Sequence, residues 1–426
     1  MSILHRVLDG MIKTGCLVVT THDGREQTYG DGTGPCICVE LTAKDTPRKI
    51  AMDPTLKLGE AYMEGELVMA KGSVYDLLDL IYRNTGPVAA RSFWMRVMQW
   101  LRFARRRFDQ LNTLSRSSRN VQHHYDLGDE LYHLFLDQDM QYSCAYFPTP
   151  ETSLDEAQLL KKRHIAAKLL ARPGEDVLDI GCGWGGMGLY LARNCGVNVT
   201  GVTLSHDQLG VAIRRAVESG LADRATFKLQ DYRTLDRQFD RIVSVGMFEH
   251  VGVNHYRNYF EKCAQMLKPG GVGLIHTIGR FGPPGITNPF IARYIFPGGY
   301  IPALSEVVSV IEETGLVVTD IEYLRLHYAE TIRHWRERFT ARWDEAKALH
   351  DERFCRMWDF YLASSEMAFR AQIMCNFQIQ IAHDQTAVPM TRDYIAEKEA
   401  ELAAKDGGPD CHRSEGTGTV HPLAAQ

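Results

Sequence analysis

Residues 177–186 place an apolar strand, a glycine-rich turn and the start of a helix directly after one another. The turn contains Gly181, Gly183 and Gly185, and glycine lets the backbone approach a ligand where a Cβ would clash. Asp179 lies two residues before the first of these glycines, at the end of the predicted strand. The segment therefore predicts a ligand site at the carboxyl end of a strand in an α/β sheet.

Turns of this kind bind two classes of cofactor. A dinucleotide-binding fold places an acid about 20 residues further on, at the tip of the second strand, for the ribose hydroxyls. Here the second predicted strand, 198–203, ends on Thr203 instead of an acid. The pattern resembles the loop with which class I methyltransferases hold S-adenosylmethionine (SAM). The turn therefore favours SAM over NAD, but it does not by itself exclude NAD.

The composition limits the classes of protein to which the chain can belong. Its 426 residues are enough for two domains, and 45% apolar with 24% charged residues are typical of a soluble globular protein. The net charge of −5 argues against a nucleic-acid partner. We expect neither a secretory signal nor a membrane span, because no apolar run approaches the ~18 residues of a span. The ten cysteines are scattered, which favours reduced cytoplasmic thiols and no metal site.

Pattern and composition divide the chain into four parts. The first carries short strand signals and predicts a small α+β domain. The third alternates strands with helices, and the fourth is rich in glycine and predicts a disordered tail. The predicted boundaries are 1–87 for the N-terminal domain, 88–120 for a basic aromatic helical linker, 121–399 for the α/β domain and 400–426 for the tail.

The linker, 88–120, combines many arginines with aromatic residues and contains a single acid, Asp109. Its apolar residues, among them Phe93, Val97 and Leu101, recur at helical spacing and form a stripe. One interpretation is a helix that joins two domains, with its stripe buried and its arginines solvated. The other is a helix on anionic lipid, where each cation contributes about 1 kcal/mol. The segment alone supports both interpretations equally.

The α/β domain predicts a mostly parallel sheet with ligands at the carboxyl ends of its strands. The candidate strands are 175–180, 198–203, 225–229, 240–245, 271–276, 316–324 and 375–382, and the helical patterns include 157–170 and 208–219. Polar residues stand at several of these strand ends, which strengthens the prediction of a site at this edge of the sheet. They are Asp179, Thr203, Asp231, Tyr232, Glu249 and His276.

Further segments identify the family that the chain resembles. They are residues 124–128, 141–147, 248–252, 276–279, 294–302 and 326–331. Together with the glycine turn, they resemble the cyclopropane-fatty-acyl-phospholipid synthases, a family that includes the mycolic acid cyclopropane synthases. The resemblance covers roughly 121–395 closely. The first 120 residues resemble the N-terminal, lipid-associated domain of the phospholipid-acting members.

The resemblance implies a class I SAM-dependent methyltransferase with a Rossmann-like, mostly parallel sheet and a smaller N-terminal α+β domain. The implied reaction adds a methylene group from SAM to a cis double bond of a phospholipid acyl chain and forms a cyclopropane fatty acid. Methyl transfer leaves a carbocation, and a bound bicarbonate then takes a proton so that the ring closes. A dry pocket that aligns the alkene with the methyl group supplies much of the rate.

The family's site residues carry over to matching positions of this chain. For bicarbonate they are Cys144, Glu249, His276 and Tyr328, with the backbone of Ile278. For SAM they are Tyr142, Ser143, Asp179, Gly181, Gly183, Gly185, Thr203, Gln208, Asp231 and Tyr232. Tyrosine and histidine can donate hydrogen bonds to an anion, and a glutamate can accept the bicarbonate O–H. Taken singly, His276 and Tyr328 are better explained as core residues, so the prediction depends on the whole set.

The chain departs from the family at Ser365, where many members have a cysteine in a Tyr-Leu-x-x-Cys pattern. A mechanism in which that thiol is the base therefore cannot operate here. Spacing does not distinguish a cyclopropane from a methyl-branched or methylene product, and a lipid-binding protein with a relic SAM fold is the alternative of another class. We expect a cytoplasmic enzyme that acts peripherally at the inner face of the membrane on unsaturated phospholipid acyl chains. A homodimer is a candidate assembly.

Overall fold

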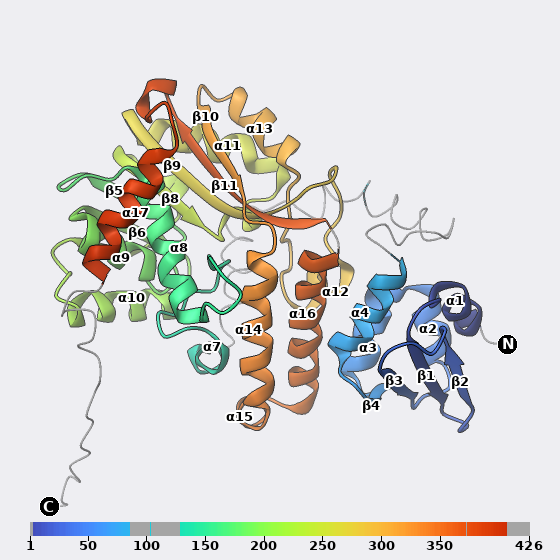
Figure 1. Cartoon of the computed structure of the whole chain (residues 1–426). Helices are drawn as coiled ribbons and strands as arrows, with labels where there is room; N and C mark the ends of the chain where they lie inside the picture. The colour runs from blue at the N-terminus through green and yellow to red at the C-terminus, as the bar shows by residue number, and fades with distance from the viewer. Residues whose placement is uncertain (1–2, 86–102, 104–127, 372, 407–426) are drawn as a thin grey trace, which may run out of the picture.

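The computed structural model describes residues 3–85, 103, 128–371 and 373–406, and these residues form two sheets with their own helices (Figure 1). The N-terminal unit, drawn in blue, lies at one end of the molecule. The larger unit contains the α/β sheet that the sequence predicts for 121–399. Among the described residues, no helix combines the length and the apolar character that crossing a membrane requires.

The N-terminal unit is built on a four-stranded sheet in the order β2-β1-β3-β4. β1 and β2 form an antiparallel hairpin, and β3 runs parallel to β1. The strands are β1 (Cys16–Thr21), β2 (Glu26–Tyr29), β3 (Cys36–Leu41) and β4 (Leu67–Lys71), and the helices are α1 (Ile3–Met11), α2 (Thr46–Met52), α3 (Pro54–Met63) and α4 (Val74–Thr85). Strand signals in the sequence predicted β1 and β3.

Cys16 and Cys36 form a disulfide between β1 and β3, with Cα atoms 4.6 Å apart. The expectation that every cysteine is a reduced thiol is therefore wrong for this pair. The two residues are directly opposite in the parallel register of β1 and β3. The sequence pattern does not reveal this pairing, because it depends on the register of two strands.

The larger sheet has seven strands in the order β10-β11-β9-β8-β5-β6-β7. Neighbouring strands from β9 to β7 are parallel, and β11 is antiparallel to both β9 and β10. The strands are β5 (Asp176–Ile180), β6 (Asn198–Thr203), β7 (Ala225–Leu229), β8 (Phe239–Val245), β9 (Leu267–Arg280), β10 (Val317–Tyr323) and β11 (Met374–Ala382). The predicted mostly parallel sheet is confirmed, and every predicted strand is present.

Helices cover both faces of this sheet, and each face has its own apolar core. Helices α8, α9 and α10 pack on one face, and α11 and α13 pack on the other. The helices of this unit are α7 (Asp129–Phe135), α8 (Leu154–Leu169), α9 (Gly186–Cys195), α10 (His206–Glu218), α11 (Tyr256–Met266), α12 (Pro289–Tyr294), α13 (Leu304–Glu312), α14 (His327–Ala341), α15 (Trp343–Leu349), α16 (Glu352–Ala371) and α17 (Asp393–Asp406). Short 3-10 turns are η1 (Tyr232–Thr234), η2 (Phe248–His250), η3 (Val253–His255) and η4 (Gln385–Ala387).

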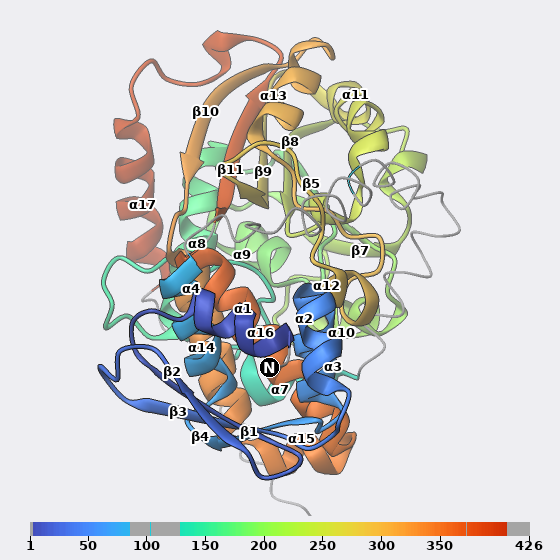
Figure 2. The same ribbon diagram turned by 90° about the vertical axis from the view of Figure 1, so that its right-hand side faces the viewer.

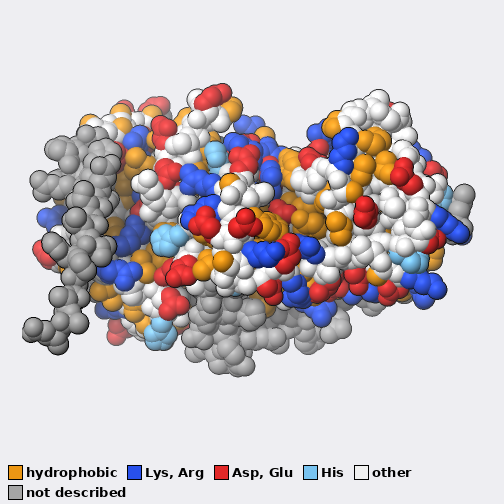
Figure 3. Space-filling model, turned by 90° about the horizontal axis from the view of Figure 1, so that it is seen from below, with side chains coloured by type: hydrophobic (Ala, Val, Ile, Leu, Met, Phe, Trp, Pro, Cys, Tyr) orange, Lys and Arg blue, Asp and Glu red, His pale blue; other side chains and the backbone are white. Residues whose placement is uncertain are grey.

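Helix α16 joins the two units, because α3 and α4 pack along it (Figure 2). Gly59 of α3 lies so close to Phe290 and Phe360 that a Cβ there would approach their rings to 2.6 and 2.7 Å. Tyr62 donates a hydrogen bond of 2.8 Å to Asp359 of α16. On the face shown in Figure 3, acidic and basic side chains are interspersed with hydrophobic ones.

The predicted tail and the predicted linker can be compared with the structure only where their residues are described. The predicted tail is wrong for residues 400–406, because α17 continues to Asp406 and packs on α8. Leu402 is fully buried there, and Asp406 accepts a hydrogen bond of 2.8 Å from Arg163. The predicted linker helix and the rest of the tail lie outside the described residues, apart from Phe103.

Candidate functional site

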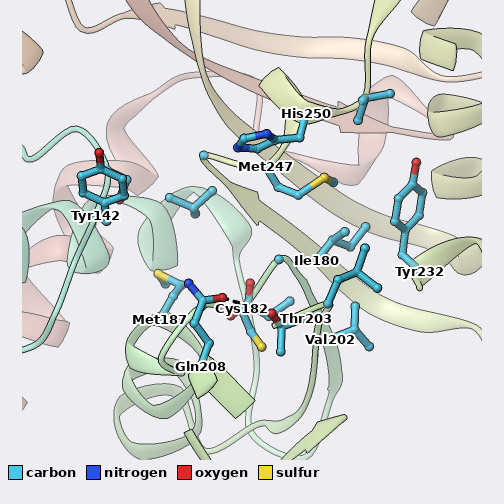
Figure 4. A pocket seen from close by; sticks show the side chains of 18 of the residues that line it. Tyr142, Ile180, Cys182, Met187, Val202, Thr203, Gln208, Tyr232, Met247 and His250 are labelled. Atoms are coloured by element: carbon cyan, nitrogen blue, oxygen red, sulfur yellow. Dashed lines mark hydrogen bonds between the residues drawn. The ribbon is translucent and has the colours of Figure 1, made fainter. Parts of the chain in front are cut away.

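A cavity lies at the carboxyl ends of β5, β6 and β8, where an α/β sheet binds its ligands. Its empty volume is about 1310 Å³, part of which is open to solvent. Figure 4 shows Tyr142 and Tyr232 on opposite sides of it, with Thr203 and Gln208 along a third side and His250 across from them. We call this cavity the donor pocket. It is lined by Tyr142, Ser143, Asp179, Gly181, Gly183, Thr203, Gln208, Asp231 and Tyr232 among the residues predicted for SAM.

The glycine turn between β5 and α9 adopts the conformation that the sequence predicts. Gly181 has a φ of +80°, and a Cβ there would come within 2.8 Å of the Met247 side chain. Gly185 differs from the prediction, because it does not line the donor pocket. It begins α9 with a φ of +83° and packs against Phe227 and Ala212. Its role is therefore to let α9 and α10 approach the sheet.

Asp179 is the most deeply buried polar residue of the donor pocket, with 1% of its surface exposed. Its Oδ2 atom has no hydrogen-bond partner among the described residues. Burial raises the pKa of this carboxyl to about 7, against a hydrogen bond from the backbone of Gly188. A buried carboxylate oxygen without a partner suits a cationic ligand group, such as the ammonium of SAM.

Thr203 and Gln208 are coupled to each other beside the glycine turn. The Thr203 hydroxyl donates a hydrogen bond of 3.1 Å to Oε1 of Gln208 (Figure 4). The Ser205 side chain accepts from the backbone N–H of Gln208 and so caps α10. Both polar side chains are buried at the tip of β6, where the ribose of a nucleoside ligand would lie.

Asp231 and Tyr232 line the donor pocket, and the carboxylate has a partner that the sequence analysis missed. Arg233 donates to both oxygens of Asp231, at 2.9 and 2.6 Å. Its guanidinium also lies 5.8 Å from the centre of the Tyr232 ring. Arg233 therefore holds the orientation of Asp231, while the aromatic ring of Tyr232 remains a surface on which a base can stack.

Tyr142 connects the donor pocket to a buried group of rings that we call the aromatic cluster. The cluster consists of Tyr132, Phe135, Tyr142, Trp335, Trp358 and Tyr361. The hydroxyl oxygens of Tyr142 and Tyr361 are 2.8 Å apart and share a hydrogen bond. The Tyr142 ring also stacks on Trp335, with centroids 5.0 Å apart. One side of the donor pocket is thus continuous with a water-poor aromatic interior.

The residues predicted for bicarbonate do not line the donor pocket, but Cys144 and Glu249 directly neighbour Ser143 and His250 in the sequence, and these two do line it. Oε1 of Glu249 accepts a hydrogen bond of 2.6 Å from the backbone N–H of Ile278, which joins two of the five predicted residues directly. Oε2 of Glu249 is buried without a hydrogen-bond partner among the described residues. Burial raises the pKa of Glu249 to about 7.

His276 lies two residues before Ile278 on β9, so both side chains are on the same face of the strand. Nδ1 of His276 is 3.2 Å from Nε2 of Gln378, and its Nε2 has no hydrogen-bond partner in the described chain. Burial holds the pKa of His276 well below its usual range, which keeps the ring neutral. The neutral imidazole of His276 and Oε2 of Glu249 are therefore two buried polar groups near β9 that can still form a hydrogen bond.

Cys144 and Tyr328 belong to the apolar core that also contacts Ile278. The Cys144 thiol is fully buried and donates to the carbonyl oxygen of Ala145, at 3.4 Å, and burial raises its pKa. Tyr328 packs against Phe369 with ring centroids 4.8 Å apart. Ile278 is thus the residue that links the set, because Glu249 bonds to its backbone and the core of Cys144 and Tyr328 packs against its side chain.

The structure adds residues that sequence reasoning did not assign. Met247 and His250 line the donor pocket, and burial lowers the pKa of His250 to about 4. Pro297 and Gly298 close another part of it. All four lie in or beside segments that carry the family resemblance, so the sequence indicated these segments but not which of their side chains face the cavity.

Comparison with family models matches two parts of the chain. The model described as mycolic acid cyclopropane synthetase matches residues 112–379. A second model, described only as a domain of unknown function, matches residues 3–92.

Individual proteins match over much of the chain. The cyclopropane-fatty-acyl-phospholipid synthase of Escherichia coli (strain K12) is 39% identical over 342 residues, which cover 80% of this chain and 86% of that protein. A probable fatty acid methyltransferase of Pseudomonas putida is 43% identical over 257 residues. That match covers 58% of this chain and 65% of the relative, slightly less than two thirds of its length. A mycolic acid cyclopropane synthase, solved in complex with SAH and CTAB, superimposes with a TM-score of 0.59 at 34% identity and covers 62% of this chain and 97% of that one.

Proposed function

Because the chain belongs to the mycolic acid cyclopropane synthetase family, we propose that it transfers the methyl group of SAM to an unsaturated phospholipid acyl chain and forms a cyclopropane. The chain has the class I SAM-dependent methyltransferase fold of that family. The observation that carries the proposal is the position of Tyr142, which lines the donor pocket and is also part of the aromatic cluster. The polar donor site therefore borders an apolar aromatic surface at this residue.

The chemistry of the proposed reaction explains why a polar donor site beside an apolar surface is useful. The electron pair of the alkene attacks the methyl carbon, the carbon–sulfur bond breaks, and SAH leaves with that bond's electrons. The neighbouring carbon of the acyl chain becomes a cation. Loss of a proton from the transferred methyl group then provides the electron pair that closes the ring. An isolated alkene is a poor nucleophile, so exclusion of water and alignment with the methyl group supply much of the rate.

The side chains of the aromatic cluster suit the cationic stage. Ring faces attract a cation by about 2 kcal/mol when both are desolvated, and they do not bond to it as an oxygen nucleophile would. Tyr142 and Tyr361 share their hydroxyl hydrogen bond, so each hydroxyl is occupied by the other.

We propose that bicarbonate is held by Cys144, Glu249, His276 and Tyr328 with the backbone of Ile278. When bound, it would supply the basic oxygen that accepts the proton from the methyl group. The fit is supported by the two unpartnered atoms, Oε2 of Glu249 and Nε2 of His276. An ionised Glu249 can accept the bicarbonate O–H, and a neutral His276 can donate its ring N–H to an oxygen of the anion.

We further propose that the enzyme works peripherally at the cytoplasmic face of the membrane, because its proposed acceptors are phospholipid acyl chains, and that it assembles as a homodimer. The N-terminal unit and the linker 88–120 are the parts proposed to meet lipid. A second product class keeps the same pocket: if a hydride shifts from the methylated carbon to the cationic carbon, loss of a methyl proton gives a methylene chain, and addition of a hydride from a reduced nicotinamide gives a methyl-branched chain. The name of the Pseudomonas putida relative, a probable fatty acid methyltransferase, favours keeping this alternative.

The test is to express the chain in a bacterial host that lacks such an enzyme and to analyse the host phospholipids. A mass increase of one methylene per unsaturated chain, with ring protons detected by NMR, is the expected result. Methyl-branched or methylene chains would replace the cyclopropane proposal with the alternative. Unchanged lipids despite good expression of folded protein would contradict both.

A further inference from the structure

A fully buried lysine, Lys161 of α8, lies directly behind the donor pocket. Its ammonium group donates hydrogen bonds to Oε1 of Gln141, at 2.5 Å, and to the hydroxyl of Ser143, at 2.8 Å. Taking an ammonium group out of water costs several kcal/mol, so a buried lysine needs compensating partners. Both partners belong to the loop that lines the donor pocket.

The same face of α8 also holds the backbone of this loop. Gln158, three residues before Lys161 and therefore on the same side of the helix, donates to the carbonyl oxygens of Gln141 and Ser143, at 3.1 and 3.0 Å. Two side chains of one helix thus bind both the main chain and the side chains of the segment around Tyr142.

Further contacts of Gln141 and Asp139 also restrict the position of this loop. The Gln141 amide donates to Asp139 at 2.9 Å, and Asp139 is ion-paired with Lys162 at 2.5 Å and with Arg215 of α10. The Ser143 hydroxyl, by contrast, accepts its hydrogen bond in the described chain from Lys161. Lys161 therefore decides where Ser143 points.

The charge of Lys161 also reaches the residues on either side of the loop. It interacts electrostatically with Asp179 in the donor pocket and with Cys144 and His276 beside β9. Burial lowers the pKa of Lys161 to about 8, while Asp137 and Asp139 oppose this effect. The side chain is thus mainly an ammonium at pH 7.

We propose that Lys161 is a positioning residue for donor binding, which holds Ser143 and Gln141 in the orientation that the methyl donor requires. The inference rests on the proposed function, because it concerns the same donor pocket. Lys161 does not line that pocket and acts through the loop. Its removal should therefore weaken donor binding more than the loss of a buried lysine elsewhere on the helix does.

The matched control is Lys168, which is equally buried on the same helix but is paired with Glu322 instead of the loop. We would measure SAH binding by calorimetry and stability by urea unfolding for Lys161→Met, Lys161→Gln and Lys168→Met. We expect about tenfold weaker SAH binding in both Lys161 variants, equivalent to about 1.4 kcal/mol. The Lys168 variant should lose stability but bind SAH as the wild type does.

A second measurement separates positioning from general loosening of the fold. In a Ser143→Ala background, Lys161→Met should change SAH affinity by clearly less than in the wild type, because the shared interaction is already absent. Full additivity, or wild-type SAH affinity in a folded Lys161 variant, would overturn the inference. Lys161→Gln keeps a polar group in the site, so its SAH affinity tests the inference if Lys161→Met does not fold. A wild-type protein that binds no SAH would instead contradict the proposed function.

Discussion

Gly181→Ala is the substitution whose effect can be worked out most directly from the structure. Gly181 has a left-handed φ of +80°, and a Cβ there would lie 2.8 Å from both Cβ and Cγ of Met247. The left-handed conformation costs an alanine about 1–2 kcal/mol. Overpacking of a closely filled site costs about 1–3 kcal/mol more. The free energy of unfolding should therefore fall by about 2–5 kcal/mol.

Part of this cost should appear in ligand binding, because Gly181 and Met247 both line the donor pocket. A shift of Met247 or of the turn that relieves the contact would therefore change the shape of the pocket. Since each 1.4 kcal/mol is a factor of ten, we expect SAH to bind about tenfold more weakly or worse. Calorimetric titration with SAH and urea unfolding measure the two effects separately.

Gly220→Ala is the matched control for backbone strain. Gly220 has a similar φ of +66°, but no atom lies within 4 Å of its Cβ position. It follows the end of α10 and does not line the donor pocket. This variant should lose about 1–2 kcal/mol of stability and keep its SAH affinity. The reasoning is refuted if Gly181→Ala binds SAH as tightly as the wild type, or if both variants lose affinity equally.

Three further outcomes are expected. Glu249→Gln should lower turnover about 100-fold or more, with little change in SAH affinity; parallel losses would mean that the carboxylate mainly positions the donor. Because burial raises the pKa of Glu249 to about 7, its carboxylate form is gained as pH rises through that value, so turnover at constant bicarbonate concentration should increase between pH 6 and 8. A flat profile in the wild type would contradict a role for the ionised form. Binding to anionic vesicles should weaken as salt rises, since the linker is rich in arginine; salt-independent binding in a sedimentation assay would exclude the electrostatic contribution.

Sequence reasoning located residues of the cavity where a polar residue type stands at the end of a predicted strand, while their roles stay predictions. Asp179, Thr203 and Tyr232 all line the donor pocket, because parallel strands bring their carboxyl ends to one edge. Gly185 is a residue of the same motif that does not line the donor pocket. Its left-handed backbone is part of the same motif, but its missing side chain makes room for Phe227 and Ala212 instead of a ligand.

Lys161 and Arg233 are two residues near the donor pocket that the sequence analysis did not identify. Both are ordinary charged residues of a helix or turn in the sequence, with no spacing that marks them. Their importance arises from what the fold brings beside them: Ser143 for Lys161 and the carboxylate of Asp231 for Arg233. A charged residue reveals its role only when its burial and its partner are known.

The sequence by itself determined the strands of the α/β sheet, the glycine turn and the family, since each depends on residues that are neighbours along the chain or on motifs in a set order. Only the tertiary structure decided the Cys16–Cys36 disulfide, the packing of residues 400–406 on α8 and the connection of the donor pocket to the aromatic cluster through Tyr142. These features depend on which faces of distant elements meet. Helical and strand periodicity orients each side chain on its own element but does not select the partner element.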